Sequence, residues 1–313
     1  MRFRSSDAAA VTGGRLCSLD RSTVPRNGLT RAWQNHGMAM TYGIHLPQYG
    51  RVASGDAVSR AARHAEDLGF RDVWVSDHIV HPAEQTYPSP FLLDPFATLS
   101  WAAAVTTRVR LGTSVLVVPQ HNPVWLANHL ASVDAMSGGR LIVGAGIGWS
   151  KREYDALGQS FETRGRRMDE ILDLLRTAWR DDPVTFDGAG HHLDAIRFLP
   201  KPAGEIPIWI GGGVEASFRR AVAKGDGFHV VGLKPPQVVP IVERLRRDRP
   251  EPSFTISART GWDPQGMDRG LIGDENAAFE AAGVQHMVAA PWQKDLDAWL
   301  RSMDLLAEIV RPG

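Results

Sequence analysis

The segment that decides the fold is "RVRLGTSVLVVPQHNPVWLANHLASVDAMSGGRLIVGAGIG", residues 108–148. It opens with an aliphatic and β-branched run, 108–118, of the kind found in buried strands. Apolar residues at helical spacing follow, from Asn122, a frequent helix cap, to the glycines 138–139, which often end helices. A second aliphatic run, 140–148, predicts another strand. Strand, helix and strand in this order predict a βα unit of a parallel sheet.

The same alternation continues from Thr41 to the end of the chain. The predicted strands are 41–48, 71–77, 108–118, 140–148, 206–213, 226–232, 253–259 and 284–290. The predicted helices that follow them include 54–70, 94–106, 122–139, 164–181, 214–225, 235–248, 274–283 and 296–310. Eight such repeats over about 270 residues predict an α/β fold of the (β/α)8 TIM-barrel type, with 40–313 as a single domain.

A doubly wound open sheet is the alternative fold. Its support is "GAGIG", 144–148, which follows a strand and resembles the glycine turn of a dinucleotide-binding fold. The spacing is G-x-G-x-G, however, and the unit is the fourth in the chain. Eight uninterrupted repeats favour the barrel.

Composition excludes several classes of partner. The 35 basic and 35 acidic residues balance, and no apolar run approaches the roughly 18 to 20 residues of a membrane helix, so we expect neither a nucleic-acid nor a membrane partner. The single cysteine, Cys17, suits a reducing cytoplasm. Residues 1–39 lack strand or helix periodicity and an apolar signal-peptide core. We expect them to be a disordered extension or the product of a mis-assigned start, with Met38 or Met40 as the true start.

Polar residues gather where the predicted strands end. The C-terminal ends of barrel strands form the mouth at which TIM-barrel active sites lie, so these residues predict a site. They are His45, Gln48, Asp77, His78, Ser114, Gln120, His121, the segment 146–152 and the glycines 211–213. No H-E-x-x-H pair, G-x-S-x-G elbow or phosphate-binding lysine loop is present, so we expect no metal and no hydrolysis.

The residues alone do not decide the roles of two features. The run Gly211–Gly213 before a helix either offers N–H groups to a phosphate or forms a tight turn that needs positive φ. Arg152 either pairs with a cofactor phosphate or with Glu153 in solvent.

Five segments together resemble the luciferase-like monooxygenase superfamily, most closely its coenzyme F420-dependent oxidoreductases. They are "YGIHLPQYG" (42–50), "GFRDVWVSDHIVHP" (69–82), the run 108–158, "RGRRMDEILDLLR" (164–176) and "PIWIGGG" (207–213). The resemblance covers nearly everything from Thr41 onward, and 108–158 is its most specific part. It implies a barrel that holds a deazaflavin or a flavin at its mouth.

The resemblance also implies residue roles. His78 corresponds to the histidine that faces the reactive carbon of F420, and Asp77 stands beside it, so both are predicted to be catalytic. A non-prolyl cis peptide is expected between Ser114 and Val115, behind the cofactor ring. The residues predicted to bind the cofactor are His45, Ser114, Val115, Gly146, Gly148, Trp149, Arg152, Gly211, Gly212 and Gly213.

One residue departs from the family pattern. Trp149 stands where the sugar-phosphate dehydrogenases of the F420 branch have a glutamate, so a general acid or base is expected to be missing there. The indole instead suggests an apolar wall for a hydrophobic substrate.

The resulting prediction is an F420-dependent oxidoreductase that transfers a hydride between the deazaflavin C5 and a hydrophobic small molecule. The alternative is a monooxygenase that uses reduced FMN and O2, and the third possibility is a non-catalytic flavin-binding barrel. The segments 96–106 and 124–136 are rich in apolar and small residues. They predict a homodimer through the second and third barrel helices, unless they only cover the barrel.

Overall fold

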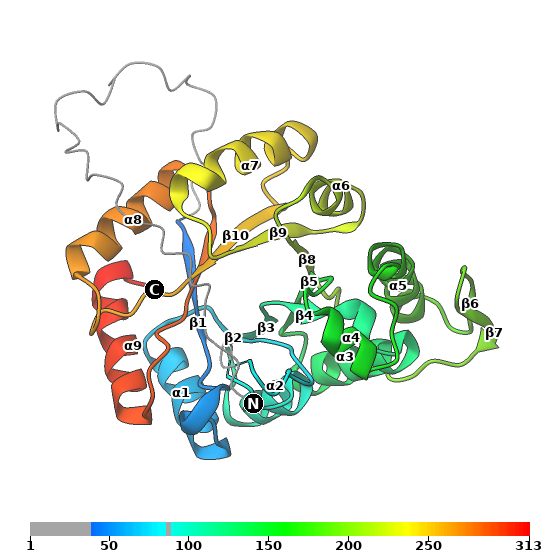
Figure 1. Cartoon of the computed structure of the whole chain (residues 1–313), viewed down its shortest axis with the longest axis horizontal. Coiled ribbons are helices and arrows are strands. Elements are labelled where there is room, and N and C mark those ends of the chain that lie inside the picture. Colours follow the sequence, from blue (N-terminus) through cyan, green and yellow to red (C-terminus); the bar gives the residue numbers. More distant parts are fainter. Residues whose placement is uncertain (1–38, 86–88) are drawn as a thin grey trace, which may run out of the picture. The chain divides into compact units, whose positions relative to one another are not determined.

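The protein is described from a computed structural model that covers residues 39–85 and 89–313. The expectation for 1–39 therefore lies, except for Ala39, outside the described residues. Parallel strands form the centre of the described chain and helices surround them (Figure 1). The strands are β1 (Thr41–His45), β2 (Asp72–Val75), β3 (Arg110–Thr113), β4 (Leu116–Val117), β5 (Leu141–Gly146), β8 (Ile208–Gly211), β9 (Gly227–Val231), β10 (Thr255–Thr260) and β11 (His286–Ala289).

The sheet closes on itself. β1 pairs in parallel with both β2 and β11, which joins the two ends of the chain. β3 pairs with β5, and the sheet then continues through β8, β9 and β10 back to β11. β3 and β4 are two parts of the third predicted strand, and the peptide bond between Ser114 and Val115 that separates them is cis, as expected. The described residues thus form the predicted (β/α)8 barrel, and the open-sheet alternative is wrong.

The outer layer consists of α1 (Gly55–Asp67), α2 (Pro95–Val105), α3 (Pro123–Ser137), α4 (Lys151–Ala156), α5 (Arg164–Arg180), α6 (Glu215–Lys224), α7 (Pro235–Asp248), α8 (Arg269–Ala281) and α9 (Leu296–Val310). Short 3-10 turns occur at Gly50–Val52 and Val118–Gln120. Polar side chains start the helices: Asn122 accepts N–H bonds at the start of α3, and Asp94 does so for α2. No helix among the described residues is long and apolar enough to cross a membrane.

Two elements differ from the predicted pattern. α8 begins at Arg269, five residues before the predicted start, because Asp268 caps it by accepting the Leu271 N–H at 3.0 Å. Two glycines in its first turns, Gly270 and Gly273, hid this start from propensity arguments. An antiparallel hairpin, β6 (Val184–Asp187) and β7 (His192–Ile196), lies on the outer side of α5 (Figure 1). Glu170 on α5 accepts the Gly190 N–H at the hairpin turn.

Most of the core lies between the barrel and its helices and is aliphatic. The barrel interior is different, because tryptophans, histidines and other polar side chains fill it in addition to aliphatic ones. The side chains of Trp74, Trp209, Ile142 and Val288 form a separate buried cluster there. TIM-barrel interiors are usually filled by branched aliphatic residues, so the polar groups need an explanation of their own.

Candidate active site

The mouth of the barrel collects the predicted site residues from five different strands. His45 ends β1, Asp77 and His78 follow β2, and Ser114 and Val115 follow β3. The remaining predicted residues end or follow β5 and β8: Gly146, Gly148, Trp149, Arg152, Gly211, Gly212 and Gly213. The fold thus brings together segments that are up to about 170 residues apart, as a barrel must.

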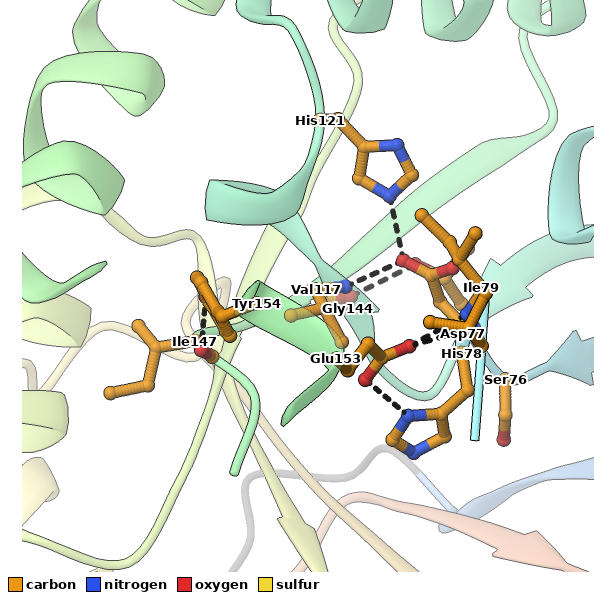
Figure 2. A network of polar contacts seen from close by, with 12 residues as sticks. Ser76, Asp77, His78, Ile79, Val117, His121, Gly144, Ile147, Glu153 and Tyr154 are labelled. Carbon is orange, nitrogen blue, oxygen red and sulfur yellow. Dashed lines mark hydrogen bonds and ion pairs between the residues drawn. The ribbon is translucent and has the colours of Figure 1, made fainter. Parts of the chain in front are cut away.

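A histidine–carboxylate pair stands beside β2 at the mouth (Figure 2). Nδ1 of His78 lies 3.0 Å from Oε2 of Glu153, and Oε1 of the same carboxylate accepts the Ile79 N–H at 2.7 Å. Glu153 is buried in the first turn of α4, whose cap Ser150 accepts the Glu153 N–H at 3.3 Å. Burial by itself raises the pKa of Glu153, but the hydrogen bonds from His78 and Ile79 outweigh it and the pKa falls below its usual value. The ionised carboxylate therefore requires an N–H at Nδ1 of His78 and leaves Nε2 for a ligand.

Glu153 is a residue of the mouth that the sequence analysis did not single out. Trp149 occupies the position of the family glutamate, as predicted, and the carboxylate of Glu153, four residues later, reaches His78. The signal was present in the run 108–158, because a serine cap at residue 150 places residue 153 in the first turn of a helix. Trp149 is 59 % exposed and its ring stands edge-on to His78, with the centroids 5.7 Å apart.

A second histidine–carboxylate pair, drawn above the first in Figure 2, is formed by Asp77 and His121. Oδ2 of Asp77 lies 2.8 Å from Nε2 of His121 and accepts the Val117 N–H at 2.8 Å. Burial opposes the charged form of His121, yet the neighbouring carboxylates, Asp77 first among them, raise its pKa above the usual value. Oδ1 of Asp77 is buried and has no hydrogen-bond partner among the described residues. Asp77 thus carries one acceptor that a bound donor would satisfy.

His45 is a buried residue at the end of β1. It is fully buried, and its ring nitrogens lie 2.8 Å from the Leu46 carbonyl and 3.0 Å from Oγ of Ser76. Burial, reinforced by the charge of Arg259, lowers the pKa of His45 to about 3, so the ring is neutral. Arg259 donates to Oγ of Ser76 at 3.0 Å and to the carbonyl of Ser114. The sequence analysis missed Arg259, whose only signal is its place at the end of a predicted strand.

The glycines of the mouth have different tasks. A Cβ on Gly146 would lie 2.5 Å from Val115, and one on Gly211 would lie 2.8 Å from it, so both glycines make room for that side chain. Gly212 adopts φ +146, and Gly213 has open space around it. In the described chain, the N–H groups of Gly212 and Gly213 donate to no other residue. The positive φ of Gly212 agrees with the turn interpretation, and the phosphate interpretation stays a prediction.

Arg152 and Gly148 complete the predicted set. Arg152 lies on the surface and pairs with Glu84 and not with Glu153, which corrects the solvent-pair alternative. Gly148 adopts φ +68, where a Cβ would lie 2.6 Å from Val117, so this position needs glycine for backbone reasons.

Exposed apolar side chains surround these polar groups. Each one ends or follows a barrel strand at its C-terminal end: Ile79, Val80, Trp149, Val214, Val231 and Trp292. Between 40 % and 61 % of each of these residues is exposed. We call this set the apolar rim. Exposed apolar groups that gather at a site are typical of a surface that binds another apolar group.

Comparison with known proteins agrees with this arrangement. An F420-dependent glucose-6-phosphate dehydrogenase of Amycolatopsis mediterranei is 33% identical over 180 residues, which is 55% of this chain and 52% of that protein. The structure of an F420-dependent secondary alcohol dehydrogenase superposes with a TM-score of 0.73 at 22% identity, over 88% of this chain and 99% of the other. A monooxygenase of Streptomyces bottropensis gives a TM-score of 0.72 at 23% identity, over 87% and 99%. The two structural likenesses establish the shared fold.

The family assignment rests on a longer match. Residues 32–264 match the luciferase-like monooxygenase family, which is more than half of the chain. The fold, the cis peptide in the third strand and the polar mouth are those that the resemblance led us to expect. The chain belongs to the luciferase-like monooxygenase family and is an oxidoreductase.

Proposed function

We propose that this protein is an F420-dependent oxidoreductase that transfers a hydride between the deazaflavin C5 and a hydrophobic small molecule. The observation that carries the proposal is the pair His78–Glu153 at the mouth, with Nδ1 and Oε2 3.0 Å apart. The carboxylate orients the imidazole and leaves Nε2 to exchange a proton with a bound group. Hydride transfer creates or removes a negative charge on the substrate, so a proton-carrying group beside it is needed.

The residues of the mouth fit such a cofactor. The buried Oδ1 of Asp77 lacks a donor, and the ring N–H of a flavin or deazaflavin would supply one. The open turn at Gly213 leaves backbone N–H groups for a phosphate, next to the start of α6, where the helix dipole favours negative charge. Bound at the mouth, F420 would supply a hydride acceptor or donor at C5.

The chain's own groups then have separate tasks. His78 holds a proton at the reacting face, and Glu153 fixes the tautomer of His78. Asp77 accepts a hydrogen bond from the cofactor while His121 holds the other oxygen of its carboxylate. The apolar rim binds the substrate and excludes water, which suits a hydrophobic substrate with few polar groups.

The first test is a titration of the purified protein with oxidised F420 and, separately, with FMN, followed by tryptophan fluorescence. We expect F420 to bind, and FMN to bind more weakly. Gly213→Val should weaken F420 binding at least tenfold, because the added side chain enters the open turn. Gly204→Val is the matched control, since a Cβ there also meets nothing within 4 Å, and Gly204 is not a mouth residue. Preference for FMN would replace the proposal by the FMN-dependent monooxygenase.

A second test separates His78 from cofactor binding. His78→Ala should leave F420 affinity within about threefold and reduce the rate of hydride transfer by about 10²–10⁴, the usual contribution of a general acid or base. An unchanged rate in a His78→Ala protein that binds F420 would remove His78 from the chemistry.

We also infer a homodimer through α2 and α3. Three large apolar side chains on these helices are exposed: Trp101 by 55%, Trp125 by 72% and Met136 by 76%. Monomers seldom expose several such groups together without a partner. Light scattering at micromolar concentration should give twice the 34.3 kDa chain mass. A monomeric mass would contradict the inference.

A further inference from the structure

A chain of hydrogen-bonded side chains runs through the interior of the barrel. It begins at Ser114, at the mouth, and ends at Asp72, the first residue of β2, at the opposite end of the barrel. The members in order are Ser114, His229, Ser257, His286 and Asp72, contributed by five different strands or strand ends. We call this set the barrel chain. The family resemblance stated above predicts that Ser114 binds the cofactor, but neither it nor the proposed chemistry assigns a role to the other four members.

The links of the barrel chain are short. Oγ of Ser114 lies 2.7 Å from Nε2 of His229, and Nδ1 of His229 lies 2.9 Å from Oγ of Ser257. That hydroxyl lies 2.7 Å from Nδ1 of His286, whose Nε2 lies 2.8 Å from Oδ1 of Asp72. All four distances fall within the range of well-formed hydrogen bonds. The register of the sheet produces the middle of the chain, because Ser257 is the partner of both His229 and His286 in neighbouring strand pairs.

Water has little access to the barrel chain. Its five members are at most 2% exposed. The indole of Trp74 stacks on His229 with 5.2 Å between ring centroids and 3° between planes, and Trp209 packs edge-on against His286 at 5.2 Å. Burying five polar side chains is unfavourable unless each one is hydrogen-bonded, and here each one is.

The hydrogen atoms of the barrel chain can be placed in two self-consistent ways. Asp72 is ionised, because its pKa is lowered by His286 and Arg110 against the effect of burial. His286 must therefore donate from Nε2. If His286 is neutral, its Nδ1 accepts from Ser257, His229 donates from Nδ1 to Ser257, and Ser114 donates to Nε2 of His229.

If His286 carries a second proton, the three links between Ser114 and His286 reverse, and the link from His286 to Asp72 is unchanged. Nδ1 of His286 then donates to Ser257, which donates to Nδ1 of His229, and His229 donates from Nε2 to Ser114. The hydroxyl hydrogen of Ser114 is then free to point toward a ligand at the mouth. The two arrangements differ by one proton, and both satisfy every link.

We propose that the barrel chain is a proton relay, which stores a proton at His286, against Asp72, and delivers it through Ser114 to the cofactor ring, behind which Ser114 is predicted to lie. This inference rests on the proposed function, because a deazaflavin ring that has accepted a hydride carries an added negative charge and takes up one proton.

The transfer balances atom by atom. Ser114 would give its hydroxyl proton to the ring and receive the Nε2 proton of His229. Nδ1 of His229 receives the hydroxyl proton of Ser257, which in turn receives the Nδ1 proton of His286. Four bonds to hydrogen break and four form, no electrons are transferred, and one positive charge passes from His286 to the ring. The end state is the first arrangement described above.

Charged groups stand at both ends of the barrel chain. At the Asp72 end, Nη2 of Arg110 on β3 lies 2.8 Å from Oδ2 of Asp72, so the carboxylate keeps its charge when His286 loses a proton. At the mouth, Arg259 on β10 donates to the carbonyl of Ser114 and lies near the neutral His45 of β1. Burial and then the charge of Arg259 lower the pKa of His229 well below its usual value. His229 therefore passes a proton on without holding the charge.

The test is to follow the ring nitrogens of both histidines by NMR in cofactor-free protein labelled with ¹⁵N-histidine, over the pH range in which the protein stays folded. As His286 gains its second proton, the single N–H of His229 should move from Nδ1 to Nε2 while His229 stays neutral. A change of tautomer in one histidine that follows the charge of another is expected from a relay and not from a rigid scaffold.

Ser257→Ala removes the central hydroxyl, and His229 should then keep one tautomer while His286 still titrates. Ser257→Thr restores a hydroxyl and should restore the coupled change. Ser302→Ala is the matched control, because Ser302 is another fully buried serine that bonds to Asp263 at 2.8 Å, away from the barrel chain. Thermal melting of each variant checks that it is folded. If Ser257→Ala does not fold, the tautomer of His229 in the unmodified protein decides the question.

A His229 that keeps one tautomer across the pH range, or a coupled change that persists in Ser257→Ala, would overturn the relay. The proposed function is tested separately by the F420 titration. If F420 binds and the tautomer of His229 is fixed, the relay alone is wrong. If neither F420 nor FMN binds but the coupled change is present, the proposed function is wrong and the relay remains a property of the barrel.

Discussion

Replacing Glu153 by alanine should destabilise the protein in a way that can be estimated from the structure. The carboxylate is 1% exposed and accepts three hydrogen bonds, from Nδ1 of His78 at 3.0 Å and from the N–H groups of Ile79 at 2.7 Å and Val80 at 3.4 Å. The bonds from His78 and Ile79 hold the segment after β2 against α4. Alanine removes both carboxylate oxygens, and with them all three hydrogen bonds, and fills none of the space.

The expected loss is about 2–4 kcal/mol of unfolding free energy. An unsatisfied buried donor costs about 1–3 kcal/mol, but Ile79 and Val80 are partly exposed, so water can replace part of what the carboxylate provides. Glu153→Gln keeps the volume and one carbonyl oxygen for Ile79, so it should cost only about 1 kcal/mol. For a chain of this size 1 kcal/mol corresponds to roughly 2–4 °C of melting temperature. Alanine should therefore lower the melting temperature by roughly 4–16 °C.

The two variants also differ in what they do to His78. The glutamine amide donates where the carboxylate accepted, so Nδ1 of His78 must become an acceptor and its N–H must move to Nε2. Thermal unfolding followed by circular dichroism gives the stabilities, and NMR of the His78 ring nitrogens gives the tautomer. Glu162→Ala, at an exposed position, should change stability by less than about 0.5 kcal/mol. A Glu153→Ala protein that melts within 2 °C of the unmodified one would refute the argument.

Three further predictions concern other parts of the barrel. Glu66 accepts N–H bonds from the turn before β3, and although burial opposes it these bonds lower its pKa to about 2. Its contribution to stability should be complete above about pH 4.5 and be lost as the pH falls toward 2, and a Glu66→Gln protein should lack this part of the acid-unfolding curve. The pKa of His121 is raised, so its contribution to the free energy of unfolding should be present below about pH 6.5 and should disappear as the pH rises through the raised value. Urea unfolding of Asp77→Asn should show no such loss of stability at high pH. Gly146→Ala should cost about 1–3 kcal/mol by urea unfolding, because the new methyl group would lie 2.5 Å from Val115; full stability would show that Val115 can move aside.

The fold was predictable because the same sequence pattern, a strand followed by a helix, repeats along the chain. Each βα unit carries an aliphatic run and a capped helix, and eight weak signals of the same kind leave few alternatives. The mouth was predictable for a related reason, since polar residues such as Asp77 and His78 that end an apolar run must leave the core. The partners of these residues were not predictable. Glu153 belongs to another unit, 75 positions after His78, and only the closed barrel decides that the two meet.

The partners within the barrel chain were also not predictable from the sequence. His229 and Ser257 each stand between two apolar residues of a strand, and His286 begins β11. On one strand such a residue is most simply a buried histidine or serine that some neighbour satisfies, and nothing in the sequence identifies the neighbour. Parallel register between three adjacent strands makes the three residues partners of one another. Each is then satisfied only because the others are present, so replacing one by an aliphatic residue leaves two polar groups unpaired.

That mutual dependence bears on why the interior is polar at all. An aliphatic interior would stabilise the barrel at least as well, since buried polar networks rarely add more stability than hydrophobic packing. The polar interior of the barrel is therefore better explained by proton transfer than by a contribution to stability. The barrel chain ends at Ser114, whose carbonyl accepts a hydrogen bond from Arg259 at the mouth. A network kept only for stability would have no reason to end there, whereas a relay that serves the mouth must.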